Sequence, residues 1–185
     1  TSNPFHNYEW LSHLEKTSCT TKLTGWEPRY FIAYEQEKVV GAIISYIKTH
    51  SYGEFIFDWQ WAQSYAHAGI NYYPKLVLAS AFTPVSNKRV IVNKKAMENI
   101  QESLLNFVID YAKEHQFTSI HSLFCTKDEL AIYEKLKFKI RLSYQFHFNN
   151  NQYNIFEDYL KTLKSQKRKN INKERKYLDT LGINY

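Results

Sequence analysis

Three side chains that can act as a general base stand close together in the sequence, at His50, Glu54 and Asp58. A base of this kind takes a proton from an attacking nucleophile. Alternating residue types from Glu54 to Asp58 predict an extended strand with both carboxylates on one face, about 13 Å apart at ~3.3 Å per residue. That distance is too large for a shared proton. We therefore interpret all three as candidate catalytic residues, one carboxylate serving as a base and the other as a partner for a cationic amine.

The two acids also have ordinary structural uses. Asp58 directly precedes a helical pattern over residues 59–68 and fits the N-cap of that helix. Glu54 fits a charge at the edge of a strand. Structural ion pairs and caps account for many acidic residues, so both interpretations stay open.

Aromatic and basic residues near these acids are candidates for substrate binding. Lys75 follows Pro74 at the start of an apolar strand pattern, where a lysine is costly unless an anion meets it. His147 lies on the polar face of an alternating segment and titrates near neutral pH. A Trp and a Tyr at helical spacing are also typical of an ordinary core. The candidate substrate-binding residues are Tyr52, Trp61, Tyr65, Tyr73, Lys75, Arg89 and His147.

The positive charge of the chain is concentrated in one segment. The net charge is +6, and residues 161–176 carry eight bases against one acid, whereas the remainder has 16 bases and 17 acids. Because an electrostatic footprint must be a surface patch, only this segment is a candidate for binding phosphate. A solvated, charge-rich helix is the alternative. The candidate phosphate-binding or tRNA-binding residues are Lys167, Arg168, Lys169, Lys173 and Arg175.

Composition excludes several classes of protein. Cys19 and Cys125 are too few for a disulfide framework or a four-cysteine zinc site, and predict a reduced, cytoplasmic compartment. The histidines show no metal-ligand spacing with acids or cysteines, so no metal site is predicted. The five glycines are too widely spaced for a Walker loop or a dinucleotide fingerprint. The longest apolar run is far shorter than the ~20 residues of a membrane helix, so no transmembrane segment is expected.

Hydrophobic periodicity predicts an α/β or α+β fold with a mixed central sheet flanked by helices, followed by a basic C-terminal helix. A first domain is expected over residues 1–150, and a helical segment over residues 151–185, with its longer helix running from Ser165 to Gly182. The expected helices of the first domain are 7–16, 59–68, 94–115 and 127–136. The expected strands are 29–34, 39–48, 54–58, 75–82, 118–124 and 138–148.

Long stretches of the chain resemble the bacterial FemAB-like family of peptidoglycan biosynthesis or recognition. They are HSYGEFIFDWQWAQSYAHAGINYYPKLVLASAFTPVSNKR, YQFHFNN and FEDYLKTLKSQKRKNINKERK. The order of elements in residues 5–148 also resembles the GNAT acyltransferase fold. The resemblance implies the first of two GNAT-like halves, with the basic helix similar to the one that opens the second half in Fem-type aminoacyltransferases. The rest of that second half is then missing.

One departure from the GNAT pattern bears on the acyl donor. GNAT enzymes that use acetyl-CoA receive its pyrophosphate on a glycine-rich turn, since only glycine lets backbone amides come close to phosphate. The corresponding residues 82–95 contain no glycine, although they contain Arg89 and three lysines. No cofactor is therefore assigned, and acyl-CoA and aminoacyl-tRNA remain alternative donors. Fem-type enzymes use the aminoacyl-tRNA ester.

The resemblance implies an N-acyltransferase or aminoacyltransferase that acts on an amine-bearing peptide or a cell-wall-like precursor. Its expected partners are a small-molecule or peptide substrate, tRNA, and the second GNAT-like half. The alternative is a tRNA-binding, phosphate-binding or ligand-recognition module without catalysis of its own. Catalysis would then belong to the second half.

Overall fold

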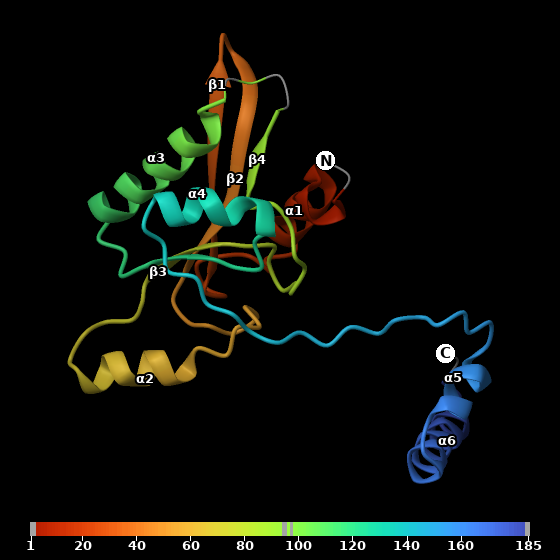
Figure 1. Cartoon of the computed structure of the whole chain (residues 1–185). Helices are drawn as coiled ribbons and strands as arrows, with labels where there is room; N and C mark the ends of the chain where they lie inside the picture. Colours follow the sequence, from red (N-terminus) through yellow and green to blue (C-terminus); the bar gives the residue numbers. More distant parts are fainter. Residues whose placement is uncertain (1–2, 94–95, 97, 184–185) are drawn as a thin grey trace. The chain divides into compact units, whose positions relative to one another are not determined.

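The computed structural model describes residues 3–93, 96 and 98–183 (Figure 1). Contacts divide the chain into two compact units, residues 1–143 and 144–185, here named the N-terminal unit and the C-terminal unit. The division falls slightly earlier than the boundary at 150 that the sequence suggests. Each unit is described by itself below.

A five-stranded mixed sheet forms the centre of the N-terminal unit, and it confirms the expected fold class. Its main order is β1-β2-β3-β5. Strands β3 and β4 both pair with β2 on the side away from β1. Only the β3–β5 pair is parallel. The strands are β1 Trp26–Glu35, β2 Lys38–Lys48, β3 Lys75–Leu78, β4 Val90–Val92 and β5 Ile120–Ser122.

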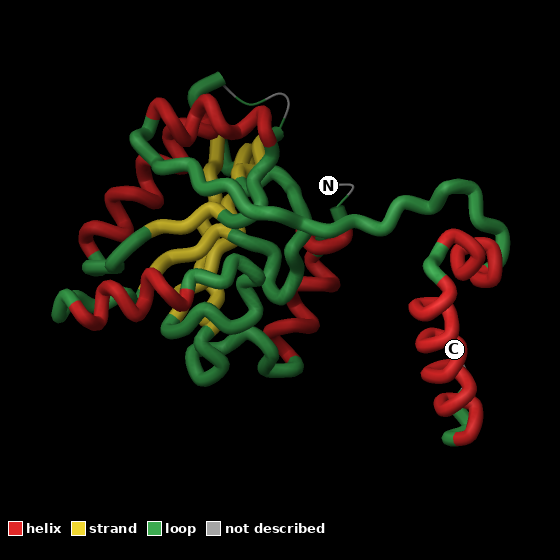
Figure 2. Tube along the Cα trace, turned by 60° about the horizontal axis from the view of Figure 1, so that its bottom comes forward, coloured by secondary structure: helices red, strands yellow, loops and turns green. Residues whose placement is uncertain are grey.

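Helices pack on both faces of this sheet (Figure 2). Successive residues of a strand point to opposite faces, so Ile43 and Ile44 of β2 belong to different apolar clusters. Leu105 and Val108 of α3 pack in the cluster of Ile43, and Leu14 of α1 packs against that of Ile44. The helices of this unit are η1 Pro4–His6, α1 Tyr8–Lys16, α2 Trp59–His67, α3 Ile100–Glu114, η2 Lys127–Glu129 and α4 Leu130–Lys135.

The expected strand over residues 54–58 is wrong. This segment is a loop of turns and bends, and Phe55 and Phe57 have φ angles of 61° and 51°. A left-handed backbone at two alternate positions cannot continue a pleated strand. The loop therefore curls back on itself between β2 and α2. The expected strand over 75–82 is shorter, because β3 ends at Leu78.

The expected strand over residues 138–148 is also wrong. Within the described residues this segment forms no strand, and Tyr144 and Phe146 are 97% and 100% exposed. Apolar and polar side chains that alternate predict a strand with one apolar and one polar face. A strand also needs a neighbouring strand that bonds to its backbone N–H and C=O groups. His147 consequently lies on an exposed segment of the C-terminal unit and not on a strand.

The helix expected over 94–115 begins later, at Ile100. The backbone N–H of Asn93 donates to the carbonyl of Val40, which extends the pairing of the preceding strand β4 with β2. Sequence reasoning missed β4, whose three residues are too few to show a period. Residues 94, 95 and 97 of the expected helix lie outside the described residues.

Two helices make up most of the C-terminal unit, as expected. They are α5 Phe156–Thr162 and α6 Ser165–Thr180. Leu160 of α5 is buried, whereas α6 has no buried residue and keeps Ile171 and Leu178 half-buried. No helix in the described part of the chain is long and apolar enough to cross a membrane.

The α3 face of the sheet should dominate the stability of the N-terminal unit. Leu105 is fully buried against the sheet, so Leu105→Ala removes packed methyl groups and leaves a cavity. We expect a loss of about 2–5 kcal/mol in the free energy of unfolding, measured by urea denaturation. The neighbouring Asn106 is exposed, and Asn106→Ala should stay within about 0.5 kcal/mol of the parent. Equal losses from the two changes would contradict this account of the core.

Candidate functional site

A buried ammonium group, that of Lys75 on β3, joins the loop of residues 49–58 to the sheet. Its Nζ donates to Glu54 Oε2 at 2.8 Å, to Asp58 Oδ2 at 2.7 Å and to Ser51 Oγ at 2.9 Å. The side chains of Lys75, Glu54 and Asp58 are all 0% exposed. These four residues, Ser51, Glu54, Asp58 and Lys75, are named the Lys75 cluster.

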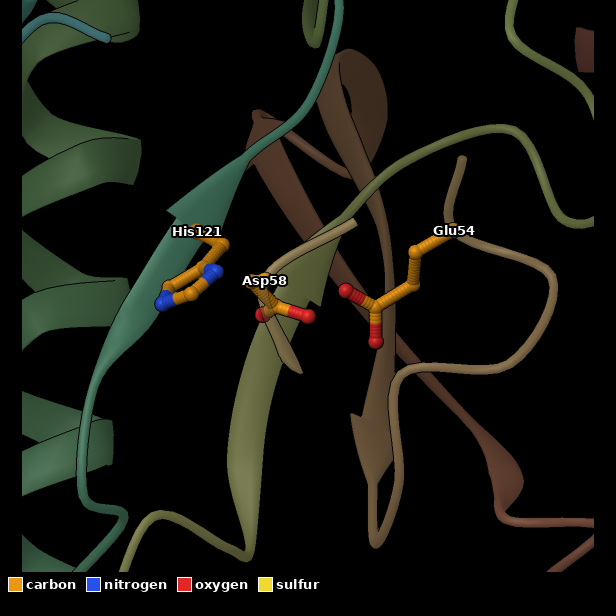
Figure 3. Close-up of side chains that lie close together, drawn as sticks. All are labelled: Glu54, Asp58 and His121. Atoms are coloured by element: carbon orange, nitrogen blue, oxygen red, sulfur yellow. The ribbon is translucent and has the colours of Figure 1, made fainter. Parts of the chain in front are cut away.

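The two carboxylates lie much closer together than the sequence suggests. In an extended strand they would be about 13 Å apart, but their nearest oxygen atoms lie within 4.8 Å of each other. The cause is the left-handed backbone at Phe55 and Phe57, which curls the loop so that both acids point inward. Figure 3 shows the two carboxyl groups facing one another. Phe55 and Phe57 themselves are exposed.

Asp58 begins helix α2 without capping it through its side chain. Its Oδ2 accepts from the hydroxyl of Tyr72 at 2.7 Å as well as from Lys75. Burial acts to raise the pKa of Asp58, but the hydrogen bonds from Lys75 and Tyr72 outweigh burial and hold that pKa below its usual range. Asp58 is therefore the carboxylate that stays ionised.

Glu54 differs from Asp58 in its electrostatics. Burial raises the pKa of Glu54, and the attraction of Lys75 only partly opposes this. Glu54 Oε1 and Asp58 Oδ1 are buried and have no hydrogen-bond partner among the described residues. Two carboxylates in one cluster thus differ in pKa, and each keeps one oxygen that can accept a proton or a hydrogen bond.

A second buried lysine, Lys48, lies directly across the sheet from Lys75 in the β2–β3 pair. Its Nζ lies 3.8 Å from the centre of the Trp26 ring and donates to the carbonyl of Tyr52 at 3.3 Å. The indole of Trp26 donates to the same carbonyl at 3.0 Å. Burial lowers the pKa of Lys48 to about 7, because Glu54 compensates only in part. Lys48 is a residue that the sequence analysis missed.

Two tyrosines connect the cluster with a hollow at the surface. The hydroxyl of Tyr73 lies 2.8 Å from Ser51 Oγ, and that of Tyr72 donates to Asp58. Their rings lie 5.5 and 5.0 Å from Lys75 Nζ. Both tyrosines also line a hollow of about 550 Å³ beside α2, here named the tyrosine hollow. Its lining residues are Ala62, Ala66, Gly69, Ile70, Asn71, Tyr72 and Tyr73.

His121 on β5 completes the surroundings of the cluster, on the other side of Asp58 from Glu54 (Figure 3). Burial and the charge of Lys75 lower the pKa of His121 to about 4. His121, Glu54 and Asp58 offer three donor atoms within 4.8 Å of one another, a spacing that a metal ion could use. The ammonium of Lys75 already lies against both carboxylates, so an amino-acid side chain supplies the cation that pairs with these acids.

His121 could not have been found from the sequence. It faces the cluster because β5 pairs in parallel with β3, which places His121 opposite Val77. These strands are separated by more than forty residues of chain. A pairing between strands so far apart leaves no local pattern.

The other candidates near the loop lie outside the Lys75 cluster. The Nε2 of His50 lies 3.0 Å from the carbonyl of Thr24, and its Nδ1 accepts from the backbone N–H of Tyr52 at 3.2 Å. The side chain of Tyr52 is exposed. On α2, Trp61 is exposed with the guanidinium of Arg141 4.7 Å from its ring, and the Tyr65 ring lies 5.1 Å from that of Tyr72.

Arg89 is buried in a network of its own. Its guanidinium donates to the carbonyls of Leu123 and Val85 and to Ser80 Oγ. The backbone N–H groups of Arg89 and Val90 donate to Oε1 of the buried Glu129. These bonds tie β4 to η2, and the guanidinium has protein partners on all three of its nitrogen atoms.

The remaining candidates belong to the C-terminal unit. His147 is exposed and its Nε2 lies 3.0 Å from Gln145 Oε1. On α6 the lysines are exposed, whereas Arg168 and Arg175 are half-buried beside the apolar stripe. Arg175 places its guanidinium 4.3 Å from the centre of the Phe156 ring. The exposed lysine candidates are Lys167, Lys169 and Lys173.

The ion pairs of Lys75 should be essential for folding. Lys75→Met leaves two buried carboxylates without their cation, and we expect the free energy of unfolding to fall by about 3–5 kcal/mol in urea denaturation. The matched control is Lys113→Met, because the Lys113–Asp110 pair is exposed. It should change stability by at most ~1 kcal/mol. Similar small losses from both changes would show that the buried pairs are dispensable.

His121 should make the protein sensitive to acid. Its pKa is depressed from 6.5 to about 4, so the unfolded chain binds the proton more readily than the folded chain. Stability should therefore be intact above pH 6.5 and fall as the pH drops toward about 4. The midpoint of urea unfolding, measured across this range, should depend less on pH in His121→Gln. The same change at the exposed His67 should leave the pH profile of the parent. A parental profile in His121→Gln would contradict this role.

Comparisons with known proteins identify the family. The family model of FemAB-like proteins, described as peptidoglycan biosynthesis/recognition, matches residues 1–185. No curated protein matches the chain. Among solved structures, the chain is similar to the "Putative acetyl transferase from Pyrococcus furiosus", with 16% identity, a TM-score of 0.48, and coverage of 80% of this chain and 83% of that one. That likeness is too weak to assign an activity. Because the family model spans the whole sequence, the resemblance read from its motifs is confirmed, and the chain belongs to the FemAB-like family.

Proposed function

We propose that the chain is the first half of an N-acyltransferase or aminoacyltransferase that acts on an amine-bearing peptide or a cell-wall-like precursor. The membership in a family of peptidoglycan biosynthesis/recognition supports the substrate class. The observation that carries the proposal is the Lys75 cluster, in which two buried carboxylates of different pKa each keep one oxygen without a partner in the described part of the chain.

Glu54 is the candidate base. An amine must be neutral to attack an acyl carbonyl, and a base must remove its proton as the new C–N bond forms and the bond to the donor breaks. The raised pKa of Glu54 moves it toward the pH at which a carboxylate accepts protons efficiently. Asp58 stays ionised and balances the charge of Lys75. The tyrosine hollow, which reaches the cluster through Tyr72 and Tyr73, is the candidate acceptor site.

In this proposal the remaining candidate residues support the site. His50 and Tyr52 belong to the loop that carries the acids, and Trp61 and Tyr65 belong to α2 beside the tyrosine hollow. Arg89 holds the scaffold, since its guanidinium is bonded to the protein. His147 stays a candidate contact of the C-terminal unit. We place the reaction in the bacterial cytoplasm, where activated acyl donors are made.

The contacts of Lys88 and Arg89, together with the lack of glycine in residues 82–95, favour an aminoacyl ester over acyl-CoA as the donor. Lys88 is paired with Asp128 at 2.8 Å, and Arg89 is buried. The segment also lacks the glycines that bring backbone amides to a pyrophosphate. Residues 144–185 then open the second half, which completes the enzyme.

The two carboxylates should be required for turnover. The test measures transfer of a radiolabelled amino acid from aminoacyl-tRNA, or of an acetyl group from acetyl-CoA, to the amine of a cell-wall peptide by the full-length protein. Glu54→Gln should lower the rate by about 10²–10⁴, as expected for a lost general base. Asp58→Asn should lower it as well, because it disturbs the charge balance at Lys75.

The matched control is Asp110→Asn, which alters an exposed carboxylate. It should leave the rate unchanged, and thermal melting should show that all three variants are folded. Full activity of Glu54→Gln and Asp58→Asn, together with loss of activity in Arg168→Ala, would make the acids part of the scaffold only.

A second candidate function is binding of a tRNA phosphate backbone by α6. Its support is the exposure of Lys167, Lys169 and Lys173 on a helix with no buried residue. Affinity for tRNA should fall steeply with salt, because each phosphate contact releases counterions. Replacing the three lysines by Ala should flatten the dependence of log Kd on log salt by roughly two to three. Weak, salt-insensitive binding would exclude this function.

A further inference from the structure

A second hollow, of about 510 Å³, lies within the C-terminal unit, where aromatic rings gather around α5. The ring of Tyr159 lies 5.4 Å from Phe148, 5.9 Å from Tyr153 and 5.7 Å from Phe156. Phe148 remains 69% exposed. This hollow is named the aromatic hollow, and its lining residues are Phe148, Asn150, Tyr153, Asn154, Ile155, Phe156 and Tyr159.

The aromatic hollow adjoins the basic helix. Arg175 of α6 lies with its guanidinium 4.3 Å from the centre of Phe156, a wall of the hollow. The unit carries eight Lys and Arg residues against four Asp and Glu residues, and seven of the eight bases lie between Lys164 and Lys176. Stacking faces and a run of positive charge therefore occur together in about forty residues.

We propose that the aromatic hollow binds an unpaired base of a single-stranded nucleic acid whose phosphates contact α6. The proposal rests on the second candidate function and adds a site to it. Aromatic faces next to a basic surface are the combination that holds single strands, because every base has a face that stacks. The amide of Asn154 at the hollow supplies a donor and an acceptor of the kind that pair with base edges, whereas the amide of Asn150 is bonded to the backbone of Tyr153.

The same charge could suit an anionic membrane, but α6 does not fit one. A helix that lies in a membrane interface needs an apolar face turned outward. The apolar residues Ile171 and Leu178 of α6 are half-buried. Of the exposed positions between them, only Tyr177 carries an aromatic ring, and the others are polar or charged. The aromatic rings around α5 surround the aromatic hollow, and a hollow of this kind suits the insertion of one ring of a ligand.

The test compares nucleic acids of equal charge, measured by fluorescence anisotropy with the chain of residues 1–185. The probes are an eight-nucleotide single strand, as RNA and as DNA, and a blunt duplex of the same number of phosphates. We expect either single strand to bind about tenfold or more tightly than the duplex. Phe148→Ala should remove most of this preference, because loss of one stacked base typically costs roughly tenfold or more in affinity.

The matched control is Phe146→Ala, which removes a fully exposed ring outside the hollow. It should keep the single-strand preference, and both variants should keep the helical circular dichroism of the parent. The salt dependence of Phe148→Ala should equal that of the parent, since stacking involves no phosphate. Lys173→Ala should instead flatten that dependence by roughly 0.7 on the single strand.

Four outcomes would overturn the site. Equal affinity for single strand and duplex, or equal effects of Phe148→Ala and Phe146→Ala, would leave phosphate binding by α6 intact and remove the base site. Binding to vesicles of anionic lipid that exceeds binding to every nucleic acid would replace the proposal with a membrane surface. Absence of any salt-dependent binding would end the proposed function of α6 as well.

Discussion

The ammonium of Lys75 is the group on which the arrangement of the N-terminal unit depends. A charged side chain with no exposure to water is strongly disfavoured unless opposite charges and hydrogen bonds replace its hydration. Lys75 meets this requirement with Glu54, Asp58 and Ser51, all from the loop between β2 and α2. The loop therefore has to curl over the end of β3, and it carries the start of α2 with it. The position of a whole helix follows from the charge of one residue.

The same constraint separates the two acids chemically. Asp58 receives hydrogen bonds from Tyr72 and Lys75 and remains charged, whereas for Glu54 burial outweighs the attraction of Lys75. Lys48, opposite Lys75 in the sheet, adds a base whose own pKa is lowered. Groups held this close with opposed pKa shifts are typical of sites where protons move.

The two units put their charged residues to different uses. In the N-terminal unit the central charges are buried and neutralised within the protein, and Arg89 with Glu129 forms another such group. In the C-terminal unit the lysines stay in water and the aromatic residues remain partly exposed. The first pattern fixes the geometry of the buried groups. The second leaves positive charge and aromatic rings exposed on the surface of the unit.

Local patterns in the sequence determined the helices α1, α2 and α6 and the β1–β2 hairpin, because their apolar spacing or sequential pairing is visible within a few residues. The sequence also marked Lys75 as a lysine that needs an anion. The tertiary structure alone decided which anion that is, since the left-handed backbone at Phe55 and Phe57 turns an apparent strand into a loop. It alone brought His121 to the cluster, through a parallel pairing of β3 and β5 that joins distant segments. Contacts of this kind are set by packing across the whole sheet, which no local period records.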